Sequence, residues 1–126
     1  MLKVYCTAVR VDFVSFGCRG DVYQAFCQER HRDNQSLQNL PELQYSILSA
    51  SGNYLKDDGV ILYSTCTLNP EENERVVERF LEENAEFSPV DFTVGGLKST
   101  SGMLTLLPHV HGTDGFFIAK LRKEKK

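Results

Sequence analysis

The spacing of apolar residues becomes regular from residue 36 onward. In residues 36–55, apolar side chains recur mostly three or four positions apart, which predicts a helix. Pro41 suits the first turn of this helix, because the N–H that proline lacks needs no partner there. Residues 59–65 then form a short apolar and β-branched run. This run predicts a buried strand that is central in its sheet and parallel in type.

A second helix is predicted after a short turn. Asn69 is a favourable N-cap, and Pro70 is a favourable first helical residue. Glu71 suits the positive end of the helix dipole and stands four residues before Arg75, which predicts an ion pair. The acidic run around it is interpreted as a helix start and a solvated face. The apolar stripe of this helix consists of Val76, Val77, Phe80 and Leu81.

The remaining C-terminal pattern is weaker. Residues 87–94 can form a strand, which Pro89 limits to an edge or an end of the sheet. Residues 95–102 are interpreted as a loop, and residues 103–115 as a second loop or turn region. Residues 115–122 alternate well enough to predict a last strand in the same sheet as residues 59–65.

Residues 1–35 show no clean period, apart from a loose alternation in residues 9–16 that is compatible with a strand. We expect this segment to be poorly anchored and to be cleaved first by proteases. The order of the other elements indicates an α/β fold, the C-terminal portion of an open sheet rather than a whole one.

Composition is that of one globular domain of 126 residues, and no apolar run approaches the roughly 18 residues that a membrane span needs. No secretory signal is evident. The net charge of −3 is segregated, because residues 36–119 are strongly acidic while residues 120–126 are basic. So short a basic tail is interpreted as a solvated chain end rather than a phosphate contact. The cysteines form no CxxC pair, which favours a reduced, cytoplasmic setting; they are Cys6, Cys18, Cys27 and Cys66.

The strand–turn–helix around Cys66 is the most informative candidate site. Open α/β sheets place their sites at the carboxyl ends of strands, and a helix N-terminus beside a cysteine favours the thiolate that a nucleophile needs. A buried structural cysteine is the alternative, and spacing alone favours it. The other cysteines are interpreted as incidental.

Two further candidate sites have weaker support from the sequence. His109 and His111 could bind a metal as an HxH pair, but no carboxylate or cysteine stands at ligand spacing, so a polar loop is favoured. Asp114 is interpreted as a turn residue before the last strand.

Two long strings carry a family resemblance. YSTCTLNPEENERVVERFLEEN (63–84) and LTLLPHVHGTDGFFIAKLRK (104–123) together resemble the C-terminal end of Sun/Nol1-type RNA (cytosine-C5) methyltransferases. They look most like the bacterial enzyme acting on small-subunit ribosomal RNA. The helix before the strand, LPELQYSILSASGNYLKDDG (40–59), resembles the same family. The resemblance covers residues 36–126 as the C-terminal part of a Rossmann-like, S-adenosylmethionine-dependent catalytic domain, and residues 1–35 are left as an unassigned segment.

The resemblance implies a chemical role for Cys66, which falls on the cysteine of the family's (S/T)C(S/T) motif. In that family the thiolate adds to C6 of cytosine, which makes C5 nucleophilic enough to take a methyl group from S-adenosylmethionine. A base then removes the C5 proton, and the thiolate leaves. The implied partner is ribosomal RNA, with no role for a metal or a membrane.

This sequence also departs from the family pattern. The glycine-rich loop that binds S-adenosylmethionine is absent, so the cofactor-binding residues are unknown and the chain alone is expected to bind the cofactor weakly or not at all. Cys18 does not match the family's second cysteine motif. The chain is either interrupted before residue 36 or has a divergent N-terminus. Two rival functions remain. The first is a non-catalytic methyltransferase remnant that acts, if at all, as a binding or interaction module, and whose unpaired sheet edge would lead to self-association. The second is a cysteine hydrolase that pairs Cys66 with His109 or His111.

Overall fold

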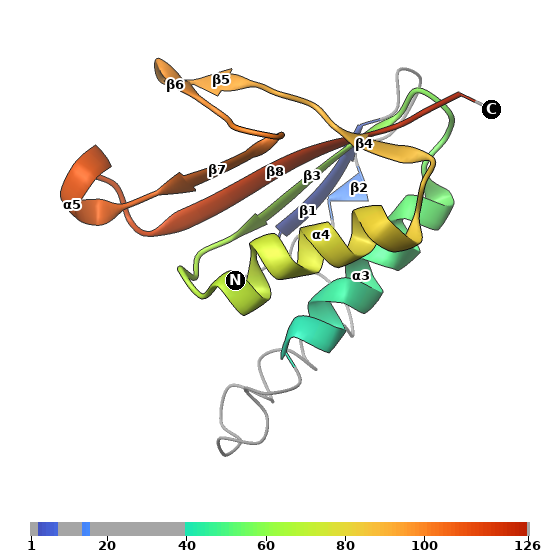
Figure 1. The fold of residues 1–126 in the computed structure, drawn as a ribbon, viewed down its shortest axis with the longest axis horizontal. Helices are drawn as coiled ribbons and strands as arrows, with labels where there is room; N and C mark the ends of the chain where they lie inside the picture. Colours follow the sequence, from blue (N-terminus) through green and yellow to red (C-terminus); the bar gives the residue numbers. More distant parts are fainter. Residues whose placement is uncertain (1–2, 8–13, 16–39, 126) are drawn as a thin grey trace.

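The computed structural model describes residues 3–7, 14–15 and 40–125. These residues form one main sheet with two helices, α3 (Leu40–Tyr54) and α4 (Glu74–Glu83), packed on the same face (Figure 1). A small hairpin of β5 (Thr93–Val94) and β6 (Leu97–Lys98) stands apart from the helical layer. No helix in the described ranges is both long enough and apolar enough to cross a membrane.

The main sheet has the strand order β2-β1-β3-β8-β4. β4 pairs with the last residues of β8, and β7 pairs with its first residues. Every one of its pairs is antiparallel. The bounds of its strands are β1 Lys3–Thr7, β2 Val14–Ser15, β3 Val60–Thr65, β4 Phe87–Pro89, β7 Met103–Leu106 and β8 Phe116–Lys123.

The prediction of an α/β arrangement with a central strand at residues 59–65 is confirmed, and so is a last strand at 115–122 in the same sheet. The parallel type predicted for β3 is wrong. The chain leaves β3 through α4 and returns along β8 in the opposite direction, so that Val60 faces Arg122 and Thr65 faces Phe117. The apolar β-branched pattern correctly marked a strand with a buried face, since Ile61 and Tyr63 are fully buried while Val60 and Leu62 are half-buried. Burial does not fix strand direction.

Strand β1 corrects a second expectation. Lys3–Thr7 pairs with β3 along its whole length, from Lys3 opposite Ser64 to Thr7 opposite Val60. The N–H and C=O groups on that side of β3 need partners, and a short extended segment supplies them. The expectation of poor anchoring is therefore wrong for Lys3–Thr7, while residues 8–13 and 16–35 lie outside the described residues. Self-association through a sheet edge stays a prediction.

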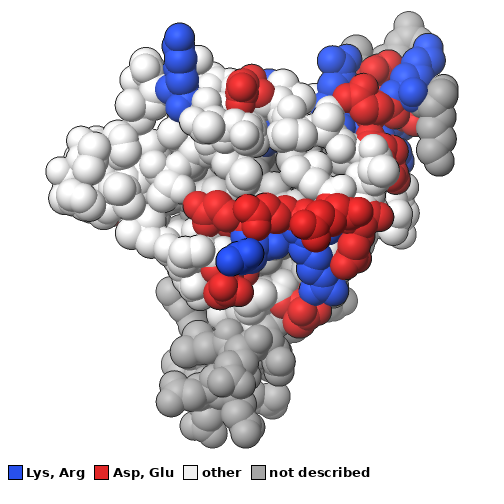
Figure 2. Space-filling model, viewed as in Figure 1, with Lys and Arg blue, Asp and Glu red and all other residues white. Residues whose placement is uncertain are grey.

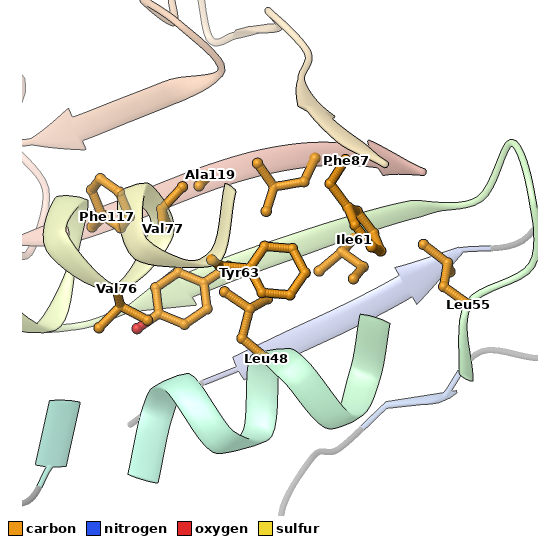
Figure 3. Close-up of a cluster of buried hydrophobic side chains, with 11 residues drawn as sticks. Leu48, Leu55, Ile61, Tyr63, Val76, Val77, Phe87, Phe117 and Ala119 are labelled. Carbon is orange, nitrogen blue, oxygen red and sulfur yellow. The ribbon is translucent and has the colours of Figure 1, made fainter. Parts of the chain in front are cut away.

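The core lies between the two helices and the strands β3 and β8 (Figure 3). Tyr63 and Phe117 meet edge to face, with ring centroids 6.2 Å apart. Phe80 meets Phe87 in the same way at 4.8 Å. Burial raises the pKa of Tyr63, and the charge of Glu72 adds to the shift. The phenol therefore stays protonated and donates a hydrogen bond of 2.6 Å to the carbonyl oxygen of Glu72.

Two predicted loops contain regular structure. Gly95 and Gly96 have positive φ angles of 55° and 80°, and they form the turn of the β5–β6 hairpin within residues 95–102. Residues 103–115 hold β7 and the short helix α5 (Pro108–His111), so the prediction of a loop or turn region is wrong for these two segments. Pro89 lies at the end of the edge strand β4, as predicted.

An exposed charged cluster joins α3 to α4. Arg79 lies over the ring of Tyr45, with 3.9 Å from its guanidinium carbon to the centroid, and its Nε is 3.0 Å from Oε1 of Glu83. The hydroxyl of Tyr45 also donates to Glu83. Arg79 reaches Glu42 at 2.7 Å as well. The cluster pins the solvent side of the two-helix layer.

Glu83 gives this cluster a predicted pH dependence. The hydrogen bond from Tyr45 and then Arg79 lower the pKa of Glu83 below its ordinary value of 4.5. A lowered pKa stabilises the fold above the unfolded-state value, and this stabilisation is lost as pH falls through the folded-state pKa. Urea titrations should therefore show Glu83→Gln less stable than the original chain near neutral pH, with the difference vanishing well below pH 4.5. Glu82→Gln, on the same exposed turn, is the control, and an equal loss there would contradict the prediction.

Candidate active site

Cys66 directly follows the last residue of β3 and is exposed to solvent. Thr65, the residue before it, is paired with Phe117 in β8. The start of β8 therefore lies beside Cys66, at the same end of the sheet. Cys66 thus occupies the carboxyl end of a central strand, where its sequence position predicted it, and its exposure contradicts the alternative of a buried structural cysteine.

The turn after Cys66 is capped as predicted, but the helix begins differently. Asn69 Oδ1 accepts from the N–H of Glu71 at 3.2 Å, and Pro70 follows this N-cap. The segment Pro70–Glu72 is a three-residue 3₁₀ helix, and α4 begins only at Glu74. The prediction of one continuous helix from Pro70 is wrong at this point. The macrodipole of α4 therefore starts further from Cys66 than the sequence suggested.

Glu72 is a structural centre of the turn rather than part of a solvated face. Its Oε1 accepts from Nε2 of Gln44, a buried residue of α3, at 2.9 Å. Its Oε2 accepts from Nδ2 of Asn69 at 3.2 Å and from the hydroxyl of Thr67 at 3.4 Å. The carboxylate therefore ties α3 to the segment that follows Cys66, which corrects the interpretation of the acidic run.

Asn73 is the residue that sequence reasoning missed. It is 1% exposed, and its amide contacts both neighbours of Cys66. Its Oδ1 accepts from the hydroxyl of Thr65, and its Nδ2 donates to the carbonyl oxygen of Thr67 at 2.9 Å. One signal was available: Asn73 precedes Val76 and Val77 by three and four residues, which places a polar side chain on the buried stripe of α4.

The loop before β8 packs against the same turn. A Cβ atom at Gly115 would lie 2.9 Å from Cγ of Leu68, so a larger residue there would displace this exposed leucine side chain. Asp114, the neighbouring residue, is exposed, in keeping with its interpretation as a turn residue. The loop that ends the HGTDG string and the Cys66 turn therefore form one surface.

The histidines stand in α5. His111 Nδ1 accepts from the backbone N–H of Leu107 at 2.9 Å, so this ring nitrogen completes the start of α5. His109 is exposed. Across the described part of the chain, no three His, Cys, Asp or Glu side chains gather as a metal ion would require.

The charge distribution limits what can approach this molecule. A continuous band of acidic side chains crosses the face shown in Figure 2. Helix α4 carries four acidic side chains, Glu74, Glu78, Glu82 and Glu83. A polyanion is repelled from such a face over roughly a Debye length, about 8–10 Å in physiological salt.

Solved structures share this fold. The chain matches NSun6 from Pyrococcus horikoshii, solved with SFG, at a TM-score of 0.64 and 32% identity over 76% of this chain and 25% of that one. A methyltransferase homolog from the same organism matches at 0.61 and 32%, over 84% of this chain and 36% of that one. The fold is therefore that of part of a methyltransferase domain.

The sequence comparison specifies the family. The sequence model of the 16S rRNA methyltransferase RsmB/F family matches residues 27–122. The probable ribosomal RNA small subunit methyltransferase B of Synechocystis is 47% identical over 93 residues, which are 70% of this chain and 21% of that protein. The chain belongs to the 16S rRNA methyltransferase RsmB/F family, and it spans about a fifth of the length of the curated relatives it matches.

Proposed function

We propose that this chain supplies the nucleophile of a ribosomal RNA (cytosine-C5) methyltransferase and that Cys66 is that nucleophile. The observation that carries the proposal is the placement of Cys66. It is exposed at the carboxyl end of the central strand, and its two neighbours are held by a buried amide. Membership of the RsmB/F family supports the substrate class.

The chemistry explains why a cysteine is needed there. C5 of cytosine is a weak nucleophile, and addition of the Cys66 thiolate to C6 forms a C–S bond that gives C5 enamine character. S-adenosylmethionine, when bound, supplies the electrophilic methyl group that C5 takes. The C5 proton then passes to a base, the C6–S bond breaks, and the thiolate is restored. Cys66 therefore ends the cycle as it began, which is the logic of covalent catalysis.

The described residues do not form a glycine-rich cradle for the methyl donor. None of their glycines lies in a turn from a strand to a helix, where a glycine-rich loop would hold the donor's polar groups. No step that depends on donor contacts is therefore assigned to these residues. Their proposed task is to present the sulfur and to shape one side of the base pocket.

The acidic side chains of α4 disfavour an approach of RNA phosphates over that helix, although Arg75 and Arg79 lie among them and form ion pairs with them. The target base must also be unpaired or flipped out, since C6 is inaccessible within a stacked duplex. The rival hydrolase needs a histidine base, and His111 already uses Nδ1 to accept from Leu107. No observation favours that rival.

A chimera tests the proposal. Residues 27–122 of this chain, which the family model matches, replace the corresponding segment of the Synechocystis relative. The chimera is incubated with 16S rRNA and methyl-tritiated S-adenosylmethionine. We expect label in the RNA and 5-methylcytidine in its nuclease digest by mass spectrometry. The intact relative is the positive control. A chimera that unfolds cooperatively but transfers no methyl group would contradict the proposed function and favour a non-catalytic remnant.

A further inference from the structure

We propose that Asn73 and Thr65 are positioning residues that fix the Cys66 turn for attack on the base. This inference rests on the proposed function, because it assigns a role in the addition step. Neither side chain is assigned to the reacting atoms. Both act through the backbone on either side of Cys66.

The contacts show one amide holding two points of the chain. The Asn73 Oδ1 accepts from the hydroxyl of Thr65, which is the last residue of β3. The Asn73 Nδ2 donates to the carbonyl oxygen of Thr67 at 2.9 Å. Thr65 and Asn73 are each 1% exposed, and the hydrogen bond between them is buried. Thr67 is half-buried, so its bond to Asn73 is only partly shielded from water. Cys66 is therefore the exposed residue between a buried anchor at Thr65 and a half-buried anchor at Thr67.

Helix capping alone does not explain Asn73. It stands at the N-cap of α4, where an asparagine side chain ordinarily accepts from an amide of the first helical turn. Here its side chain makes no capping hydrogen bond. Its backbone carbonyl oxygen accepts the first hydrogen bond of the helix, from the N–H of Val77 at 3.2 Å. The amide faces β3 and the turn instead. The helix thus forgoes its usual cap in favour of bonds that fix Cys66.

A second anchor holds the far half of the turn. The hydroxyl of Thr67 donates to Glu72 at 3.4 Å and accepts from the N–H of Asn69 at 3.1 Å. Gln44 of α3 fixes the same carboxylate at 2.9 Å. The turn is therefore held from both the α4 side and the α3 side, and loss of the Asn73 bonds would free its first half.

A loosened turn affects the addition step in particular. Covalent attack requires the sulfur close to C6 and correctly aligned, and a misplacement of about 1 Å can lower a rate about 100-fold. Binding of the methyl donor does not depend on the position of this sulfur. The rate of adduct formation should therefore fall while the KM for the donor is preserved.

The experiment uses the chimera and RNA that carries 5-fluorocytosine at the target, where the C5–F bond blocks the final release and traps the adduct. Thr65→Val removes the hydroxyl at nearly constant shape, and Thr65→Ser retains it. We expect Thr65→Val to slow adduct formation by about 100-fold, with the donor KM changed by less than about 2-fold. Thr65→Ser should restore the rate to within about 3-fold of the unmodified chimera. Asn73→Asp, which loses the donor to Thr67, should be as slow as Thr65→Val.

Ser99→Ala is the matched control. Its hydroxyl is also buried and also makes two hydrogen bonds, with the N–H of Phe92 and with Asp91, but it stands after β6. It should lower the melting temperature without slowing the adduct. The inference is overturned if Thr65→Val reacts at the full rate, or if Ser99→Ala slows the adduct equally. If the unmodified chimera forms no adduct, the proposed function itself fails and this inference falls with it.

Discussion

Cys66→Ala in the chimera should abolish the covalent adduct with 5-fluorocytosine RNA and lower methyl transfer by on the order of 10⁴-fold or more, the scale seen when a catalytic nucleophile is removed. The physical reason is that C5 stays a poor nucleophile unless sulfur adds at C6. Cys66 is exposed, so its removal leaves no cavity and should not affect folding. Denaturing gels that resolve the RNA–protein adduct measure the first effect, and tritium incorporation measures the second.

Cys27 supplies the matched control, because it is the other cysteine within residues 27–122, the segment that the family model matches. Cys27→Ala in the chimera should leave the adduct in place, because the sequence does not give Cys27 the setting of a nucleophile. Cys66→Ser should behave like Cys66→Ala, because a hydroxyl is far less ionised than a thiol near neutral pH. An adduct that survives Cys66→Ala would show that the nucleophile stands elsewhere in the protein.

Local patterns in the sequence predicted the helices and the main strands well. The three- and four-residue spacing placed α3 and the stripe of α4, and the N-cap at Asn69 was found from its residue types alone. The ion pair between Glu71 and Arg75 is present at 4.0 Å, between two exposed side chains that gain little from it. These features depend on neighbours within one or two helical turns, which a single sequence displays directly.

The site itself could be predicted only in part. The place of Cys66 followed from the strand and the cap, but the bonds of Asn73 to Thr65 and Thr67 cross the gap between two elements. Strand direction failed for the same reason, because a β-branched run shows burial and not the identity of the pairing strand. β7 was missed since its four residues are all half-buried and show no alternation.

The core offers the largest expected effect on stability. Phe80 of α4 is fully buried, stacks edge to face on Phe87, and reaches Gly52 of α3, where a Cβ atom would lie 3.0 Å from the ring. Phe80→Ala should lower the free energy of unfolding by about 3–5 kcal/mol, because it loses the buried ring and leaves a cavity. A typical domain has only about 5–15 kcal/mol in total. The loss would therefore bring the chain close to unfolding.

Urea unfolding followed by circular dichroism measures this loss, and two variants frame it. Phe80→Leu keeps most of the apolar volume and should lose about half as much or less. Leu81→Ala, at a partly buried position beside the same core, should also lose less. Equal losses in all three variants would contradict the cavity explanation.

Phe80 also anchors the helix that begins just after Asn73, so the alanine variant should free the Cys66 turn only when α4 as a whole detaches. Thr65→Val should instead loosen the turn while the melting of α4 is nearly unchanged, which separates packing of the helix from positioning of the cysteine.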